Sequence, residues 1–209
     1  DNAAASNTFF GYTVAQIGDV NNDGFDDVAV SQPGYSNGQA SEGRVLVFLG
    51  SATGLTNTAS WAVESNIANA FMGFKVAGGA SVNGDAFDDL VVGAENADGT
   101  RGRVWLYRGQ SNAATPGRGG LSAASIWTVG GDGIPDVDYF WGDFLGSDLA
   151  LGDFNCDGFA DIAVGSFGYE YELGRVQIFY GNATPPFVAT NADLELFGHP
   201  QLVGRHAQN

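Results

Sequence analysis

The feature that most constrains this chain is a nine-residue pattern that occurs three times, at residues 19–27, 81–89 and 153–161. Each copy has oxygen-bearing side chains at positions 1, 3, 5 and 9, and a phenylalanine at position 7. Position 6 is glycine in the first and third copies, but Ala86 in the second. Alternate residues of a tight turn can point toward one centre, and glycine permits the sharp bend that this requires. The sequence therefore predicts three similar turns lined by oxygen atoms.

The oxygen-lined turns have the ligand chemistry of calcium sites, because Ca2+ takes six to eight oxygen ligands at about 2.3–2.6 Å. The predicted ligands are the side chains at positions 1, 3, 5 and 9 and the backbone carbonyl at position 7, namely Asp19, Asn21, Asp23, Phe25 and Asp27, then Ser81, Asn83, Asp85, Phe87 and Asp89, then Asp153, Asn155, Asp157, Phe159 and Asp161. The alternative is a set of polar turns that bind no metal.

The second copy is expected to bind calcium more weakly than the other two. Its first position is the neutral Ser81, so it offers fewer carboxylates, and the number of charged ligands sets affinity in such sites. Ala86 would add strain if position 6 needs a left-handed backbone conformation.

The residues after each loop distinguish strands from helices. A helix-flanked calcium loop ends in a bidentate Glu at position 12, whereas position 12 here is Val30, Val92 or Val164. Short runs of β-branched residues surround these valines, and such runs indicate buried strands. The loops are therefore expected to connect strands.

A larger unit repeats together with the loop, because the three first positions lie 62 and then 72 residues apart. Each loop is followed by another strand that begins Gly-Arg-Val, at residues 43–48, 102–107 and 174–179. Both faces of these strands are largely apolar, whereas a sheet with one solvated face would alternate apolar and polar residues. A repeated four-stranded unit with two apolar faces is typical of a propeller blade.

The predicted fold class is therefore all-β, a β-propeller built of four-stranded antiparallel blades, with about three blades present as a partial ring. The expected bounds are about 8–63 for the first blade, 71–129 for the second and 144–198 for the third, with the start of a fourth at 203–209.

The units resemble FG-GAP repeats, which form the propeller blades of integrin alpha subunits. The resemblance rests on Phe10-Gly11 and on the loops at 19–27 and 153–161, while the Gly-Ala-Pro part of the motif is replaced by Ser31-Gln32-Pro33. It implies a seven-bladed ring, calcium between the first and second strands of a blade, and ligand binding on the opposite face. Three blades leave apolar outer faces, so further blades from the parent chain or from other copies are expected to complete the ring.

The charge of the chain restricts its partners. Eight Lys and Arg residues oppose 24 Asp and Glu, which gives a formal net charge of −16. Nucleic acids and anionic membranes attract basic surfaces, so neither is an expected partner. The sequence has no apolar run that could insert into a membrane. Strand-loop calcium sites are usually weak and suit calcium-rich surroundings, so the expected location is extracellular or at the cell surface.

The sequence predicts a binding module and no enzyme, because His199 and His206 are the only histidines and no Gly-x-Ser-x-Gly motif occurs. Ligand recognition, with a protein or glycan as partner, is expected on the face opposite the calcium loops, at Asp136, Asp138, Tyr139, Trp141, Tyr169, Glu170, Tyr171 and Glu172. Within the insertion at 130–143, an additional calcium site and a structural cover remain alternatives. A self-assembling repeat segment of a coat or filament, and an accessory propeller of a larger secreted enzyme, are the alternative functions.

Overall fold

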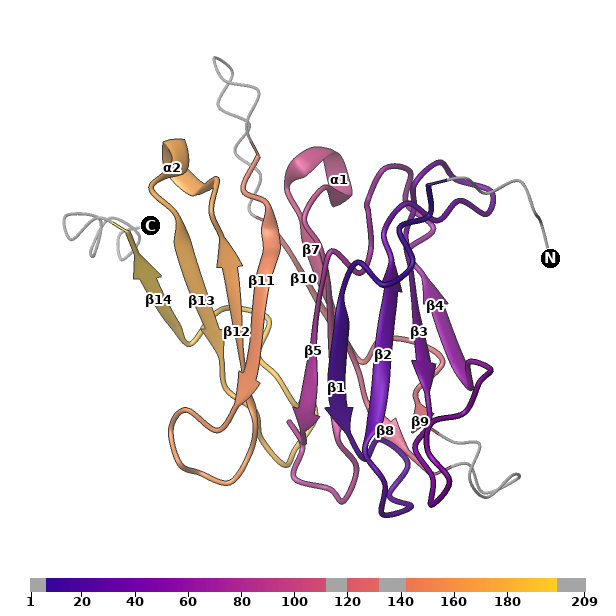
Figure 1. Cartoon of the computed structure of the whole chain (residues 1–209). Helices are drawn as coiled ribbons and strands as arrows, with labels where there is room; N and C mark the ends of the chain where they lie inside the picture. Colours follow the sequence, from indigo (N-terminus) through magenta and orange to yellow (C-terminus); the bar gives the residue numbers. More distant parts are fainter. Residues whose placement is uncertain (1–6, 112–119, 132–141, 199–209) are drawn as a thin grey trace.

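The computed structural model describes residues 7–111, 120–131 and 142–198 of the 209-residue chain. Three four-stranded antiparallel sheets stand side by side in chain order (Figure 1). We call them blades one, two and three. The all-β prediction is confirmed, as is the four-stranded antiparallel blade. The predicted start of a further blade at 203–209 lies outside the described residues.

Within each blade the four strands are neighbours in the sheet in the same order in which they occur along the chain. Blade one contains β1 (Val14–Gly18), β2 (Asp27–Gln32), β3 (Arg44–Phe48) and β4 (Trp61–Glu64). Blade two contains β5 (Lys75–Ala80), β6 (Asp89–Ala94), β7 (Arg103–Tyr107) and β10 (Trp127–Gly130). Blade three contains β11 (Leu145–Gly152), β12 (Asp161–Ser166), β13 (Arg175–Phe179) and β14 (Leu194–Phe197).

The remaining elements are short and lie between strands. A two-stranded sheet is formed by β8 (Gly109–Gln110) and β9 (Gly120–Leu121). Two four-residue segments, α1 (Ala97–Thr100) and α2 (Tyr169–Glu172), lie at the upper end of blades two and three (Figure 1), and α1 is irregular because Asp98 and Gly99 have φ of 56° and 73°. Among the described residues, no helix has the length and the apolar character needed to cross a bilayer.

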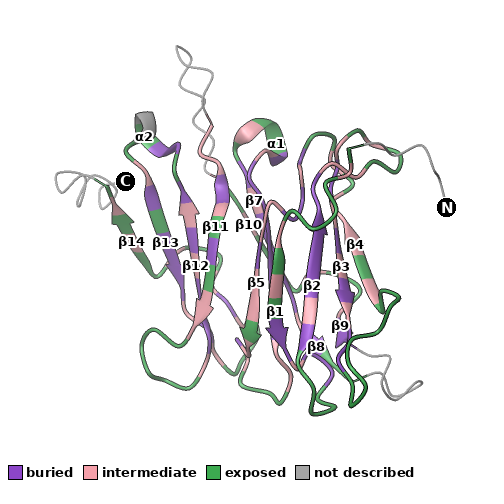
Figure 2. Cartoon of the chain, viewed as in Figure 1, coloured by how far each residue is buried: buried purple, intermediate pink, exposed green. Residues whose placement is uncertain are grey.

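The strands of blade two supply side chains to two separate cores. Leu90 and Val92 of β6 belong to the cluster shared with blade one, whereas Val91 between them belongs to the cluster shared with blade three. All six residues of β6 are buried (Figure 2). Successive side chains of a strand point to opposite faces of its sheet, so one apolar strand can serve two neighbouring blades. This arrangement explains why both faces of these strands are apolar.

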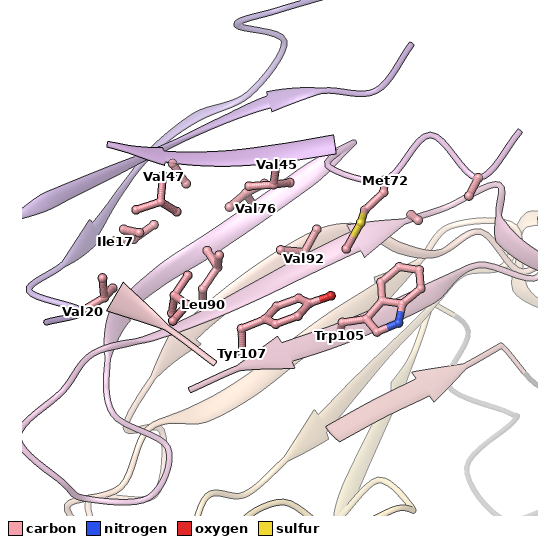
Figure 3. Close-up of a cluster of buried hydrophobic side chains, with 14 of the residues drawn as sticks. Ile17, Val20, Val45, Val47, Met72, Val76, Leu90, Val92, Trp105 and Tyr107 are labelled. Atoms are coloured by element: carbon pink, nitrogen blue, oxygen red, sulfur yellow. The ribbon is translucent and has the colours of Figure 1, made fainter. Parts of the chain in front are cut away.

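The first core lies between blades one and two. Figure 3 shows Val45 and Val47 of β3 near Val76 and Val92 of blade two, with Tyr107 of β7 in the same cluster. Its members come from both sheets, so the sheets pack face to face. The relative position of the blades is therefore fixed by side-chain packing as well as by the connecting chain.

A tryptophan on the outer strand of a blade fastens that blade to the next one, and this contact occurs twice. The Trp61 ring lies edge-on against Tyr107, with centroids 5.1 Å apart, and its Nε1 donates a hydrogen bond to the carbonyl oxygen of Ser122 at 3.2 Å. Trp127 meets Phe179 at 5.0 Å in the same way, and its Nε1 donates to the carbonyl oxygen of Ala189 at 2.8 Å. The indole thus combines apolar packing with a satisfied polar group.

We expect Trp127→Ala to lower the free energy of unfolding by about 3–5 kcal/mol, because it leaves a cavity between blades two and three. Trp127→Phe keeps an aromatic ring but loses the hydrogen bond to Ala189. The loss of that bond should lower the free energy of unfolding by about 1 kcal/mol. Urea unfolding followed by fluorescence and circular dichroism measures both. The exposed Leu55→Ala is the control and should change the free energy by less than about 0.5 kcal/mol. If Trp127→Ala lowers the free energy of unfolding as little as the control does, the Trp127 contact does not stabilise the packing of blade two against blade three.

Candidate metal centres

The three predicted calcium loops connect the first and second strands of each blade, and all three lie at the same end of the molecule. They join β1 to β2, β5 to β6 and β11 to β12, at the lower edge of Figure 1. The opposite end carries the connections between second and third strands, including α1 and α2. Each of the three loops therefore connects two strands, as the sequence predicts.

The carboxylate at position 1 organises the turn in loops one and three. In loop one, Asp19 Oδ1 accepts a hydrogen bond from the backbone N–H of Asp23 at 3.0 Å, and Asp19 Oδ2 accepts one from that of Gly24 at 2.7 Å. Loop three repeats both contacts from Asp153, at 3.1 and 3.0 Å. These carboxylates face the inside of the turn, as a cation ligand would.

Loop two is built differently at position 1. Ser81 Oγ donates a hydrogen bond to Asn83 Oδ1 at 2.8 Å, so it occupies an amide oxygen that is itself a predicted ligand. The amide of Asn83 in turn donates to Asp85 Oδ2 at 2.8 Å, a contact that also occurs between positions 3 and 5 of the other loops. Loop two thus has one carboxylate fewer facing the turn.

The aspartate at position 9 is fully buried in every loop. In loop one, Asp27 Oδ2 accepts from the backbone N–H of Val20 at 3.0 Å, and Asp27 Oδ1 accepts from that of Gly50 at 2.8 Å. Asp89 and Asp161 make the same pair of contacts, to position 2 of their loops and to the glycine after the third strand. Each carboxylate therefore ties its loop to the third strand. A carboxylate has about four lone-pair sites, so a cation could share it.

Burial changes the protonation of two of these aspartates. It raises the pKa of Asp27 to about 6, although the N–H groups of Gly50 and Val20 act in the opposite direction. It raises the pKa of Asp89 to about 7 in the same way. A nearby cation favours the charged form of a carboxylate, so a cation held beside either aspartate would lower its pKa again.

The backbone of the loops turns through left-handed residues at position 4 and position 6. Gly24 and Gly158 at position 6 have φ of 93° and 91°. Position 4 is left-handed in all three loops, with φ of 55° at Asn22, 70° at Gly84 and 61° at Cys156. Ala86 has no positive φ, so the strain expected there is not found. Loop two makes its left-handed turn at Gly84 alone.

The donor set fits calcium in loops one and three, which each offer three carboxylates, an amide oxygen and a backbone carbonyl. Across the described residues, no group of three or more His, Cys, Asp or Glu side chains is gathered in a geometry that holds a metal ion. The loop oxygens accept the N–H groups of their own turn instead. Calcium binding would therefore draw together side chains that the turn already points inward.

The predicted ligand surface at the opposite end is only partly described. Asp136, Asp138, Tyr139 and Trp141 lie outside the described residues. Glu170 is exposed in α2. The structure describes the backbone of Tyr171 and Glu172 but not their side chains.

Tyr169 is not on the exposed surface that the sequence suggested. It is buried, and the Arg175 guanidinium carbon lies 3.9 Å from the centre of its ring. Arg44 covers Tyr35 in blade one in the same way, at 3.8 Å. The recurring arginine of the Gly-Arg-Val strand therefore holds the upper loop of its own blade. The repetition of that arginine in the sequence indicates a shared structural role, but it does not identify the tyrosine as the partner.

One contact between loops could not be found from the sequence. Asp88 at position 8 of loop two accepts a hydrogen bond from the backbone N–H of Asp19 in loop one, at 2.9 Å. The two residues are separated by 69 positions in the sequence, and position 8 is not among the predicted ligand positions. Burial raises the pKa of Asp88, against the effect of the Asp19 N–H.

Comparisons with known proteins agree with the repeat structure. The model of the FG-GAP repeat family matches residues 10–48 and 145–179. Mouse integrin alpha-IIb is 35% identical over 102 residues, which is 48% of this chain and 9% of that protein. Integrin alpha-5 of Xenopus laevis is 32% identical over 114 residues, which is 51% of this chain and 11% of that protein. The matches therefore span about a tenth of the length of these relatives.

We expect Asp161→Asn to destabilise the chain by about 1–3 kcal/mol even in the presence of a chelator, because one of the two backbone donors at this site loses its acceptor. Asp157→Asn in the same loop is the matched control, since Asp157 is exposed. Urea unfolding of both variants in EDTA measures the difference. An Asp161→Asn variant that is as stable in EDTA as the wild-type chain would show that the position 9 aspartate has no role without metal.

Proposed function

We propose that this chain, whose repeats resemble those of the FG-GAP family, is an extracellular calcium-binding module that recognises a protein or glycan ligand. The observation that carries the proposal is the repetition of one loop architecture at the same end of three blades. In each loop the position 9 carboxylate is fixed by two backbone N–H groups, and in two of them the position 1 carboxylate is fixed as well.

Calcium has a structural role in this proposal. The side chains that would hold it in loop one are Asp19, Asn21, Asp23 and Asp27, together with the carbonyl of Phe25, and the equivalent residues would hold it in the other loops. When bound, the cation neutralises carboxylates that otherwise repel one another. The connection between loop and blade comes from the chain itself, because the buried aspartate joins each loop to the end of the third strand.

The proposal includes an extracellular or cell-surface location and assigns no catalytic role. Weak calcium sites of this kind suit the calcium concentrations found outside cells. The formal net charge of −16 also argues against binding to nucleic acids.

Further blades are proposed as partners of the two outer blades. Val176, Leu194 and Leu196 are exposed on blade three, whereas Val45, which holds the position of Val176 on β3, is buried against blade two. Val176, Leu196 and Phe197 line part of a groove of about 430 Å3. A face of this kind is complementary to another blade, from the parent chain or from another copy. In the second case the chain would be a structural, self-assembling segment.

Ligand recognition is proposed at the end opposite the calcium loops. This end carries the upper loops, which the recurring arginines hold in place, and Gly131 and Phe144, on either side of residues 132–141, donate backbone hydrogen bonds to Gly102 and to Thr100 of α1. Rigid loops that bear aromatic and acidic side chains suit a recognition surface, because little entropy is lost when they bind. The residues proposed to contact the ligand are Asp136, Asp138, Tyr139, Trp141, Glu170, Tyr171 and Glu172.

The calcium role predicts that chelation lowers the melting temperature. Each site stabilises the folded chain by about 2.7 kcal/mol when calcium is at a hundredfold excess over its Kd. Asp157→Ala should reduce the calcium-dependent shift more than Asp85→Ala, because loop three has the larger set of carboxylates. Differential scanning calorimetry in calcium and in EDTA measures both effects. A melting temperature that is identical in calcium and in EDTA would refute the calcium role.

The recognition role predicts that Tyr139→Ala combined with Trp141→Ala weakens ligand binding by about tenfold or more, as expected for central aromatic contacts. Phe154→Ala is the matched control, because Phe154 is an exposed aromatic residue in calcium loop three, at the opposite end. Binding of the immobilised chain to a glycan array and to a panel of matrix proteins is the measurement. If both variants bind like the wild type, the upper face is not the recognition surface.

A further inference from the structure

We infer that Asp88 is a positioning residue that couples calcium loops one and two. Asp88 holds position 8 of loop two, between the predicted ligands Phe87 and Asp89. Its Oδ2 accepts a hydrogen bond from the backbone N–H of Asp19 at 2.9 Å, and its own backbone N–H donates to the carbonyl oxygen of Asp19 at 3.2 Å. Asp19 is the first predicted ligand of loop one. The coupling rests on the proposed calcium role, whereas the hydrogen bonds between Asp88 and Asp19 are observed directly in the structure.

The backbone of blade one is shaped to admit the Asp88 side chain. Gly18 precedes Asp19 at the end of β1, with φ of 69°, where the register of β1 against β2 shifts. A Cβ atom at Gly18 would lie 1.9 Å from Asp88 Oδ2 and 2.9 Å from the Cα of Gly79. Only a glycine at this position leaves room for the carboxylate, so the contact depends on local features of both blades.

The next junction between loops lacks the side-chain contact, which provides an internal comparison. Position 8 of loop three is Ala160, whose backbone N–H donates to the carbonyl oxygen of Ser81 at 2.8 Å. The backbone half of the contact is therefore repeated, but Ala160 has no carboxylate to accept a bond from the Ser81 N–H. In loop one, position 8 is Asp26, whose carboxylate accepts from Gln16 within its own hairpin.

The geometry gives the two loops a direct mechanical connection. A cation in loop two would be held by Asp85, Asp89 and the carbonyl of Phe87, and would thereby immobilise Asp88 among them. Asp88 in turn fixes both backbone polar groups of Asp19, whose side chain is the first ligand of loop one. Coupling between two sites is reciprocal, so a cation in loop one strengthens loop two equally. Loops one and two are thus expected to bind calcium as a pair, and loop three separately.

A calcium titration of the 209-residue chain followed by NMR tests the coupling at each loop. The amide signals of Gly24, Gly84 and Gly158 report on loops one, two and three. Asp88→Ala should raise the midpoint for Gly24 by about tenfold, as is typical when a residue that orients a metal ligand is removed. The midpoint for Gly158 should not change. Asp26→Ala is the control for loss of one nearby carboxylate, and should shift the Gly24 midpoint much less.

Asp88→Asn separates positioning from charge, because an asparagine keeps an oxygen that can accept the bond from the Asp19 N–H. If Asp88 acts by position, Asp88→Asn should retain most of the affinity at Gly24, whereas Asp88→Ala does not. Equal weakening by the two substitutions would mean that only the negative charge matters, and would overturn the positioning role.

Hydrogen exchange provides a readout that needs no metal. In EDTA, the Asp19 amide should exchange faster in Asp88→Ala than in the wild type or in Asp88→Asn. If the wild-type chain binds calcium while Asp88→Ala leaves the Gly24 midpoint and the Asp19 exchange unchanged, the inference is wrong and the proposed function stands. If the wild type binds no calcium, the proposed function and the coupling fail together, and the exchange rate of Asp19 alone decides whether the contact exists.

Discussion

The arrangement of the loops and strands in each blade depends on one buried residue, the aspartate at position 9 of the loop, whose two carboxylate oxygens each accept a hydrogen bond from a backbone N–H. Asp27, Asp89 and Asp161 each bind the loop before them and the glycine that ends the third strand of the same blade. A buried carboxylate is costly unless its oxygens are satisfied. Since both oxygens accept backbone donors here, the residue fixes where the second strand begins, how the loop closes and where the third strand ends. The loop and the blade are therefore one unit.

Face-to-face packing then extends this unit along the chain. Alternate side chains of β6 and β7 enter two different cores, so blade two is held from both sides. Trp61 and Trp127 add the same contact at two successive junctions, from the outer strand of one blade to the third strand of the next. Because each blade is placed relative to its neighbour by the same contacts, equivalent loops arrive at the same end of the molecule. The alignment of the candidate calcium loops is a consequence of blade packing.

Local patterns made the fold and the position of the loops predictable. Three copies of one ligand pattern, each followed by β-branched residues, were sufficient to predict strand-flanked loops and four-stranded blades. The sequence could not predict that Tyr169 lies buried beneath Arg175, because exposed and covered tyrosines look alike in a short polar loop. It also gave no sign of the contact between Asp88 and Asp19, which depends on the spacing between two sheets. The condition for strain at Ala86 is not met, because Ala86 has no positive φ and position 6 of loop two is not left-handed.

The hydrogen bonds within the loops determine how far each loop would have to rearrange to hold the proposed cation. In loops one and three, the position 1 carboxylate already faces the turn, since it accepts N–H groups from positions 5 and 6. Less ordering is then required when a cation binds, which favours affinity. In loop two the hydroxyl of Ser81 instead occupies the oxygen of Asn83, so a cation must displace that bond. Under the proposed coupling, loop two would gain most from a connection to its neighbour, and it is the loop that supplies Asp88.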